Sequence, residues 1–181
     1  MRTRAGEPKP RTEGKMLKTN ITRNFDNTIT IITPKRVRFS EYFVNYRAFT
    51  CTIDIDKQEI VFGKYNSWEY EDDDMANDSY ADEISPVYTF TDFAKDLPGC
   101  IEKTYIWKMI FNDHYDNPRI DAPMWMHEDL CELTEFMHEV QNLLTLSELL
   151  PIEYTKEFHN VKHKFRQANW LYRQFEDVLN S

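Results

Sequence analysis

Glycine is scarce in this sequence, with only four Gly among 181 residues. Phosphate-binding loops and dinucleotide-binding turns depend on clustered glycines, because close backbone approach and positive φ favour a residue without a Cβ. We therefore expect neither class of nucleotide-binding protein. Gly-x-Ser-x-Gly, His-Glu-x-x-His and Walker sequences are also missing, so the common motifs of serine hydrolases, zinc proteases and P-loop enzymes are excluded.

Cysteine is sparse and widely spaced. Cys51, Cys100 and Cys131 form no Cys-x-x-Cys pair, which excludes a zinc ribbon or a thioredoxin-type redox centre. An odd number of distant thiols predicts reduced cysteines in a reducing compartment, and we expect a cytoplasmic protein.

Long apolar runs are missing as well. No stretch approaches the roughly 18 consecutive apolar residues of a membrane-spanning helix. The first residues are polar and basic, so we expect no secretory signal and no membrane contact. Hydrophobic residues nevertheless make up 41% of the chain and aromatic residues 14%. That composition is sufficient for a folded core and excludes a wholly disordered chain.

Charge is distributed unevenly along the chain. The net charge is −9, but residues 1–38 carry ten Lys or Arg and three Asp or Glu, whereas residues 39–181 carry twelve and 28. This split predicts a basic, disordered arm, residues 1–26, attached to one acidic domain, residues 27–181. The bases of residues 1–38 could make weak, sequence-independent contacts with nucleic acid, or could simply solubilise the chain.

The hydrophobic pattern predicts an α+β fold in which a small antiparallel sheet of about four strands precedes three helices. Residues 27–96 are expected to be mainly β, and the predicted strands are 28–33, 47–55, 59–65 and 86–90. Strands 47–55 and 59–65 are predicted to form a hairpin in a sheet with one solvent-exposed face. Residues 67–85 are polar and acidic and are predicted to form an extended loop.

Residues 97–181 are predicted to be helical. Asp96 and Pro98 are typical of a helix start, and this first helix should run to about residue 112. A proline-containing loop follows at 113–123. Apolar residues at 3-4 spacing predict two further helices over 127–145 and 155–179. The short break between them predicts an antiparallel helical hairpin.

Patterns typical of metal sites and of nucleophilic catalysis are incomplete. Glu135 and His138 match Glu-x-x-His, but the second copy that a di-metal bundle needs is missing. The helical positions of His138, His159 and His163 point away from the predicted apolar stripes. Cys131 lies one turn from His127 with no third group to orient the pair. We therefore expect a protein that is not an enzyme and has no metal or cofactor.

Acidic residues dominate two segments. Residues 65–94 contain nine acids and residues 120–155 contain eight, and neither segment has a Lys or Arg. Four Glu at 4, 3 and 4 spacing form a helical ridge of carboxylates about 5–6 Å apart, roughly the spacing of phosphates along a nucleic-acid strand. The predicted partner-binding residues are Trp68, Glu69, Tyr70, Glu71, Asp72, Asp73, Asp74, Asp78, Asp82, Glu83, Glu128, Glu132, Glu135 and Glu139.

A second candidate interface lies on the last predicted helix, opposite its apolar stripe. Basic and aromatic side chains at helical spacing suit an anionic or protein partner. The residues of this face are His159, His163, Arg166, Trp170 and Arg173. The alternative is that Trp170 packs inside the domain.

These observations favour a non-catalytic interaction or regulatory protein. Its acidic face would mimic nucleic acid, bind a basic, nucleic-acid-binding surface of another protein and inhibit that protein. A composition low in Gly and rich in Asn, Asp, Tyr and Phe is typical of phage or mobile-element proteins, which would place it in the host cytoplasm. Two alternatives stay open: an assembly subunit that uses the basic arm and the C-terminal helices, and an enzyme without a recognisable motif. The oligomeric state also stays open.

Overall fold

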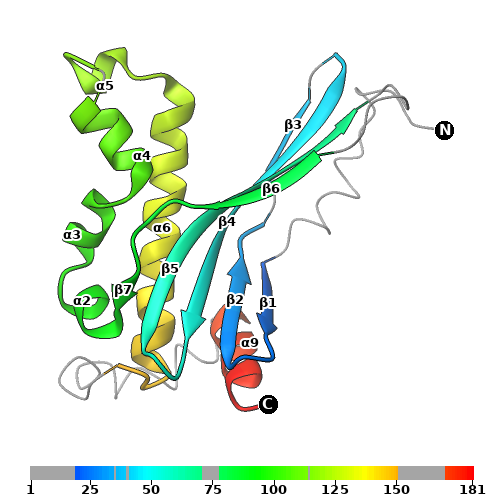
Figure 1. The fold of residues 1–181 in the computed structure, drawn as a ribbon, viewed down its shortest axis with the longest axis vertical. Helices are drawn as coiled ribbons and strands as arrows, with labels where there is room; N and C mark the ends of the chain where they lie inside the picture. Colours follow the sequence, from blue (N-terminus) through cyan, green and yellow to red (C-terminus); the bar gives the residue numbers. More distant parts are fainter. Residues whose placement is uncertain (1–18, 35, 40, 71–77, 114, 151–169) are drawn as a thin grey trace.

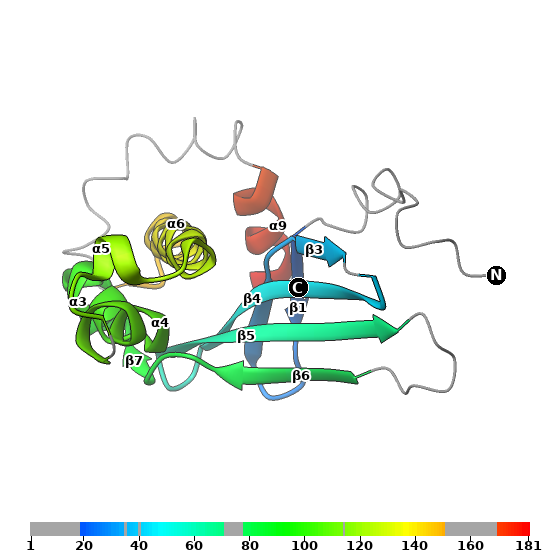
Figure 2. The same ribbon diagram turned by 90° about the horizontal axis from the view of Figure 1, so that it is seen from above.

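The structure is a computed structural model that describes residues 19–34, 36–39, 41–70, 78–113, 115–150 and 170–181. An antiparallel sheet comes first in this part of the chain and helices follow, so the predicted α+β class is confirmed (Figure 1). Helices α6 (Met124–Leu146) and α9 (Trp170–Leu179) lie over one face of the sheet (Figure 2). None of the described helices combines the length and hydrophobicity needed to cross a bilayer.

The described residues form seven strands, more than the four expected. They are β1 (Asn20–Arg23), β2 (Thr28–Ile32), β3 (Arg36–Phe39), β4 (Phe43–Asp54), β5 (Glu59–Tyr70), β6 (Asp78–Glu83) and β7 (Tyr88–Thr89). The order is β1-β2-β4-β5-β6, while β3 pairs with the outer half of β4 and β7 pairs with the start of β5.

The predicted hairpin is confirmed as β4 and β5, each 12 residues long. Phe49, Cys51 and Ile53 are buried on the helix-facing side, whereas Thr50 and Thr52 alternate with them on the other face. Both strands continue beyond the predicted hairpin, to Phe43 and Tyr70. The longer ladder projects past the helices and supports β3 and β6 (Figure 1).

The predicted acidic loop at 67–85 is wrong for residues 67–70 and 78–83, which form strands. Residues 67–70 continue β5, and β6 pairs with β5 from Gly63–Glu83 to Trp68–Asp78. An acidic strand is stable here because successive side chains point to opposite faces and β6 lies at a solvated sheet edge, where charged residues are common. Residues 71–77 lie outside the described residues.

The expected basic arm also contains a strand. Residues 1–18 lie outside the described residues, but Asn20–Arg23 forms β1 and pairs with β2 from Asn20–Ile32 to Arg23–Ile29. The Arg23 guanidinium donates hydrogen bonds to the backbone carbonyls of Val178 and Leu179 in α9, at 3.2 and 2.7 Å. Contacts to the last helix therefore fix this segment, which local composition alone would leave unfolded.

The predicted helix 96–112 begins as expected but is interrupted. Asp96 caps α3 (Leu97–Glu102) by accepting a hydrogen bond from the Gly99 N–H. Buried Thr104 then starts a new turn, α4 (Tyr105–Lys108), by accepting from the Trp107 N–H, and a π-helical turn, η1 (Met109–Asp113), follows. Two short helices were not predicted, α2 (Phe90–Lys95) before this region and α5 (Pro118–Asp121) in the expected loop.

The core lies between α6 and the sheet. The α6 side chains Leu133, Met137, Val140 and Leu144 are fully buried, as the 3-4 spacing predicts. The Phe136 ring packs edge-on against Phe62 of β5, with 5.7 Å between the ring centroids.

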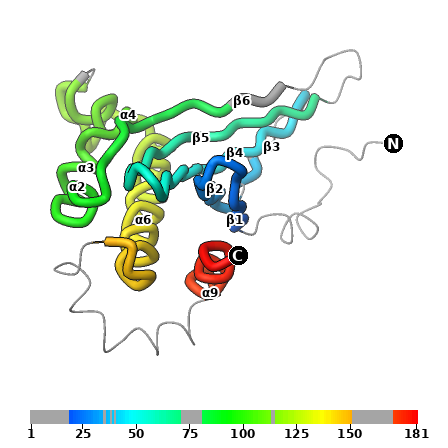
Figure 3. The backbone as a smooth tube through the Cα atoms, turned by 60° about the horizontal axis from the view of Figure 1, so that its bottom comes forward, coloured from blue at the N-terminus to red at the C-terminus, as the bar shows by residue number. Residues whose placement is uncertain are grey.

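Of the predicted last helix, residues 155–169 lie outside the described residues and 170–179 form α9. Tyr172 and Phe175 of α9 are buried, and the Tyr172 hydroxyl donates to the carbonyl of Leu146 at the end of α6. Figure 3 shows α9 next to β1. The helical hairpin itself stays a prediction.

Candidate functional site

A buried ionic cluster joins α6 to the sheet. Asp129 of α6 is fully buried and accepts hydrogen bonds from Arg36 of β3 at 2.7 Å and from Lys64 of β5 at 3.1 Å. The Arg47 guanidinium of β4 lies 3.7 Å from the same carboxylate. Burial opposes ionisation of Asp129, but the Arg36 hydrogen bond and the charges of Lys64 and Arg36 lower its pKa below the usual value. The carboxylate is therefore ionised at neutral pH.

Strand geometry brings these cations together. Arg36 is opposite Arg47 across the β3–β4 pair, and Lys64 is opposite Phe49 across the β4–β5 pair. Because side chains alternate along a strand, all three cations lie on the helix-facing side.

Asp129 was not among the residues predicted from the sequence, although an acid at 129 falls between apolar residues 126 and 133 of the helical stripe. An acid in such a stripe indicates a buried cationic partner.

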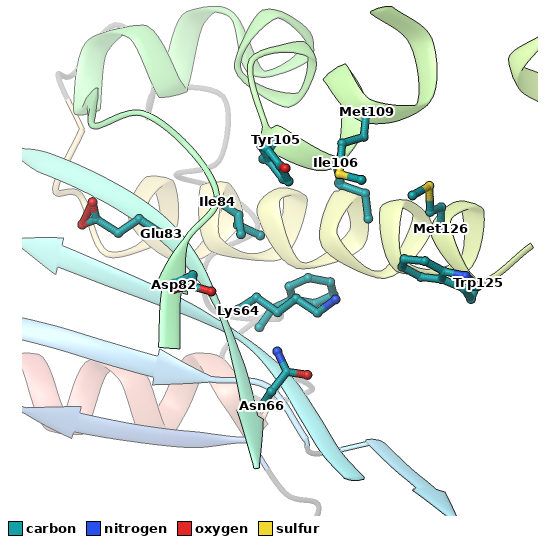
Figure 4. Close-up of a pocket in the computed structure, with 11 residues that line it drawn as sticks. Lys64, Asn66, Asp82, Glu83, Ile84, Tyr105, Ile106, Met109, Trp125 and Met126 are labelled. Atoms are coloured by element: carbon teal, nitrogen blue, oxygen red, sulfur yellow. The ribbon is translucent and has the colours of Figure 1, made fainter. Parts of the chain in front are cut away.

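A cavity of about 460 Å³ lies beside this cluster, between β5, β6, α4 and α6 (Figure 4). We call it the β6 cavity. Its apolar lining is Phe49, Ile84, Ile106, Met109 and Met126, and its polar and aromatic lining is Lys64, Asn66, Asp82, Glu83, Tyr105 and Trp125.

Lys64 crosses this space from β5 toward α6. Its ammonium lies 5.9 Å from the centre of the Trp125 ring, and Asp82 is its cross-strand neighbour on the same face of the sheet. Figure 4 shows Asp82 next to Lys64, with Glu83 extending outward. Because Asp129 pairs with Lys64, the carboxylate of Asp82 is the main negative charge at the rim on this face of the sheet, and Glu83 adds a second one at the outer edge of β6.

Exposed aromatic and apolar side chains surround the same opening. Tyr105 is 61% exposed and Trp125 39%, and both line the cavity. Large aromatic residues and Met are enriched at protein interfaces, and clustered exposed apolar groups indicate a binding surface. The β6 cavity therefore offers an apolar interior with a negatively charged and aromatic rim, which suits a side chain with an aliphatic stem and a cationic end.

A second cavity of about 350 Å³ lies on the opposite flank of α6, toward β1, β2 and α9. Glu132, Glu135 and Glu139 line it together with Arg36 and Leu171. Arg36 contacts Glu132 at 2.7 Å. Burial raises the pKa of Glu139, and it also raises that of Glu132 despite the nearby charge of Arg36.

The predicted acidic face is thus divided between two places. Asp82 and Glu83 lie at the β6 edge. Of the α6 ridge, Glu132, Glu135 and Glu139 line the second cavity, toward β1 and β3, and Glu128 is exposed on the same helix. Glu69 is exposed on β5 and accepts a hydrogen bond from the Tyr46 hydroxyl. Asp78 belongs to β6, and Glu71, Asp72, Asp73 and Asp74 lie outside the described residues.

The predicted aromatic anchors occupy the projecting end of the sheet. The rings of Trp68 and Tyr70 lie 4.9 and 6.0 Å from the ring of Phe43. For the second predicted face, Trp170 is 48% exposed and Arg173 is exposed on α9. His159, His163 and Arg166 lie outside the described residues.

Features of enzymes are few in the described part of the chain. There, no group of three His, Cys, Asp or Glu side chains is placed to coordinate a metal ion. Burial raises the pKa of the Cys51 thiol and raises that of Cys100 to about 11, while Cys131 is exposed. The His127 ring lies 3.1 Å from the Pro118 carbonyl, which ties it to α5.

Comparisons with protein-family models, with curated proteins and with solved structures found no match. The geometry of the β6 cavity is therefore the basis for a functional proposal.

Proposed function

We propose that this chain is a non-catalytic interaction protein that binds a basic segment of another protein at the β6 cavity. One observation supports the proposal above all. Exposed Tyr105 and Trp125 and the carboxylate of Asp82, with Glu83 beside it on β6, border a single cavity of about 460 Å³ with an apolar interior.

The chemistry of the cavity favours Lys or Arg as the inserted side chain. An aliphatic stem would bury apolar surface against Ile84 and Ile106, and the cationic end would reach Asp82. The face of Tyr105 attracts a cation, worth about 0.5–2 kcal/mol depending on solvation, whereas the Trp125 ring already lies near the Lys64 ammonium and adds apolar surface. A neutral side chain would gain no charge interaction with Asp82, and an acidic one would be repelled by it.

Such binding would also make the protein an inhibitor of a nucleic-acid-binding partner. A Lys or Arg segment that contacts phosphates cannot at the same time contact the rim carboxylates. We therefore expect a short DNA duplex and this protein to compete for the same basic segment. Both interactions should weaken as salt rises, because exposed charges are screened over a Debye length of about 10 Å at 0.1 M ionic strength.

Selection from a random peptide library displayed on phage tests the proposal for a partner whose sequence is unknown. The purified full chain is the bait, and enriched peptides are synthesised and titrated by calorimetry at low and at moderate salt. We expect enriched sequences with clustered Lys or Arg and at least one apolar residue. Enrichment of sequences without basic residues, or of none, contradicts the proposal.

A matched pair of double variants locates the binding surface. Asp82→Asn with Glu83→Gln should weaken peptide binding about tenfold or more and should flatten its salt dependence. Glu128→Gln with Glu135→Gln removes the same charge from the α6 ridge and should change affinity by less than about threefold. Loss of binding only in the ridge variant would move the interface to the other flank of α6.

A further inference from the structure

The sheet has two edges that differ in how they are covered. β1 contacts α9, whose last carbonyls accept hydrogen bonds from Arg23. At the other edge, β6 pairs with β5, and no other strand among the described residues pairs with it. Ala81, Asp82 and Glu83 are all exposed there. A strand with one open side offers backbone donors and acceptors to a further strand.

The geometry determines which backbone groups of β6 face outward. The Ile84 N–H donates to the Phe62 carbonyl at 2.9 Å, and the Asp82 carbonyl lies 2.8 Å from the position that a Cβ on Gly63 would occupy. Both groups point toward β5. Because inward and outward groups alternate in an antiparallel ladder, the N–H and C=O of Ala81 and Glu83 point away from β5.

We infer that the open edge of β6 is extended by a basic β-strand of the partner protein, which places a Lys or Arg side chain at the β6 cavity. The inference rests on the proposed function and specifies how the partner is bound. Backbone hydrogen bonds to Ala81 and Glu83 would give affinity, and side chains on alternate residues would give specificity, as in other cases of strand addition.

The negative charge of β6 favours a basic strand of a partner over a second copy of this chain at the open edge. A second copy of the chain pairing through β6 would bring Asp82 and Glu83 close to the same residues of its partner, and like charges on paired strands are destabilising. A strand with Lys or Arg instead places opposite charges across the new ladder. The six residues of β6 span about 20 Å. A partner strand of similar length would reach from the β6 cavity to the Phe43–Trp68 aromatic pair.

Removal of one outward backbone donor, the Ala81 N–H, tests the inference. Ala81→Pro removes the outward N–H and leaves the Lys64–Asp82 ladder position intact, whereas Ala81→Val keeps the N–H. With a basic peptide selected from the phage library, we expect Ala81→Pro to weaken binding at least about tenfold. Ala81→Val should change affinity by less than about threefold.

A measurement on the unmodified chain covers the case in which Ala81→Pro fails to fold. Amide exchange followed by NMR should slow at Ala81 and Glu83 when the peptide is bound, and N-methylation of alternate peptide amides should abolish binding. Unchanged exchange at both amides overturns the inference. So does dimerisation through β6, detected as a concentration-dependent mass that Ala81→Pro abolishes.

The two proposals can fail separately. If Asp82→Asn with Glu83→Gln weakens peptide binding but Ala81→Pro does not, the partner uses side-chain contacts alone. The function then stands and strand addition is wrong. If no basic peptide binds the wild-type chain, both proposals are wrong.

Discussion

Helix α6 contacts the sheet in two chemically different ways along its length. Its C-terminal half packs Phe136, Met137 and Val140 against an apolar surface that includes Phe62. Its N-terminal half contacts the sheet through Asp129 and three cations. On β5, the contacts to α6 change from apolar to ionic between Phe62 and Lys64, two residues apart. Apolar burial has no preferred direction, whereas a buried ion pair is stable only with its partners in place. The apolar half therefore contributes most of the stability, and the ionic half determines where α6 lies beside the β6 cavity.

Removal of the central ring in the apolar half should have the largest effect. Phe62 is fully buried, and the rings of Phe93, Phe136 and Tyr88 lie 5.6, 5.7 and 6.4 Å from it. We expect Phe62→Ala to lower the free energy of unfolding by about 3–5 kcal/mol, measured by urea denaturation. A loss below about 1 kcal/mol would show that the apolar half is not the main source of stability. Val61→Ala, on the opposite face of the same strand, is the control and should cost much less.

The ionic half should respond most to loss of its single buried anion. Asp129→Asn would leave Arg36, Arg47 and Lys64 near one another with only Glu132, which contacts Arg36, as a counter-charge. Breaking a buried ion pair by removing one partner costs about 3–5 kcal/mol, and partial exposure of these cations places the expected loss near 3 kcal/mol. Glu128→Gln, one residue away and exposed, should stay within about 0.5 kcal/mol. Equal stability of the Asn variant and wild type would contradict a stabilising role for the cluster.

The pH dependence of this difference has a definite sign. The folded-state pKa of Asp129 is lowered, so ionised Asp129 stabilises the fold above its unfolded pKa, about 3.9. That contribution is lost as pH falls through the lower, folded-state pKa. The stability gap between wild type and Asp129→Asn should therefore be constant near neutral pH and should shrink below about pH 4. A gap that grows on acidification would contradict the assignment.

A smaller effect is expected where β6 joins the sheet. A Cβ on Gly63 would lie 2.6 Å from the Thr50 hydroxyl and 2.8 Å from the Asp82 carbonyl, so Gly63→Ala must displace both of them. We expect a loss of about 1–3 kcal/mol together with weaker peptide binding at the β6 cavity. Thr50→Ala combined with Gly63→Ala removes the side-chain contact but leaves the backbone contact. The double variant should therefore recover only part of the loss, and full recovery would show that β6 is not displaced.

Local patterns predicted the elements whose hydrophobic periodicity agrees with their surroundings. The alternation over 47–65 gave the β4–β5 hairpin, and the 3-4 spacing over 127–145 gave most of α6. β3 and β6 were missed for a shared physical reason. In β3 the helix-facing Arg36 is a cation whose burial depends on Asp129, 93 residues away. In β6 an acidic segment is a strand because β5 pairs with it.

The candidate site could be predicted only in part. Charge density indicated Asp82 and Glu83 as binding residues, and that assignment remains a prediction supported by their position at the cavity rim. Tyr105 and Trp125 gave no signal in the sequence, because their role depends on α4 and α6 meeting the end of β6. The π-helical turn after α4 and the cap at Thr104 orient this region. Neither feature follows from hydrophobic periodicity.

The Asp129 cluster also favours one pairing register of the strands that it joins. A slip of β3 by one residue against β4 would turn Val37 toward α6 in place of Arg36, because side chains alternate with a period of two. The same slip of β5 would exchange Lys64 for Gly63 or Tyr65. In either case α6 could approach the sheet only by burying a carboxylate that has lost one of its three cationic partners. A misaligned sheet therefore gains less stability from its contact with α6, and through one carboxylate the registers of β3, β4 and β5 depend on one another.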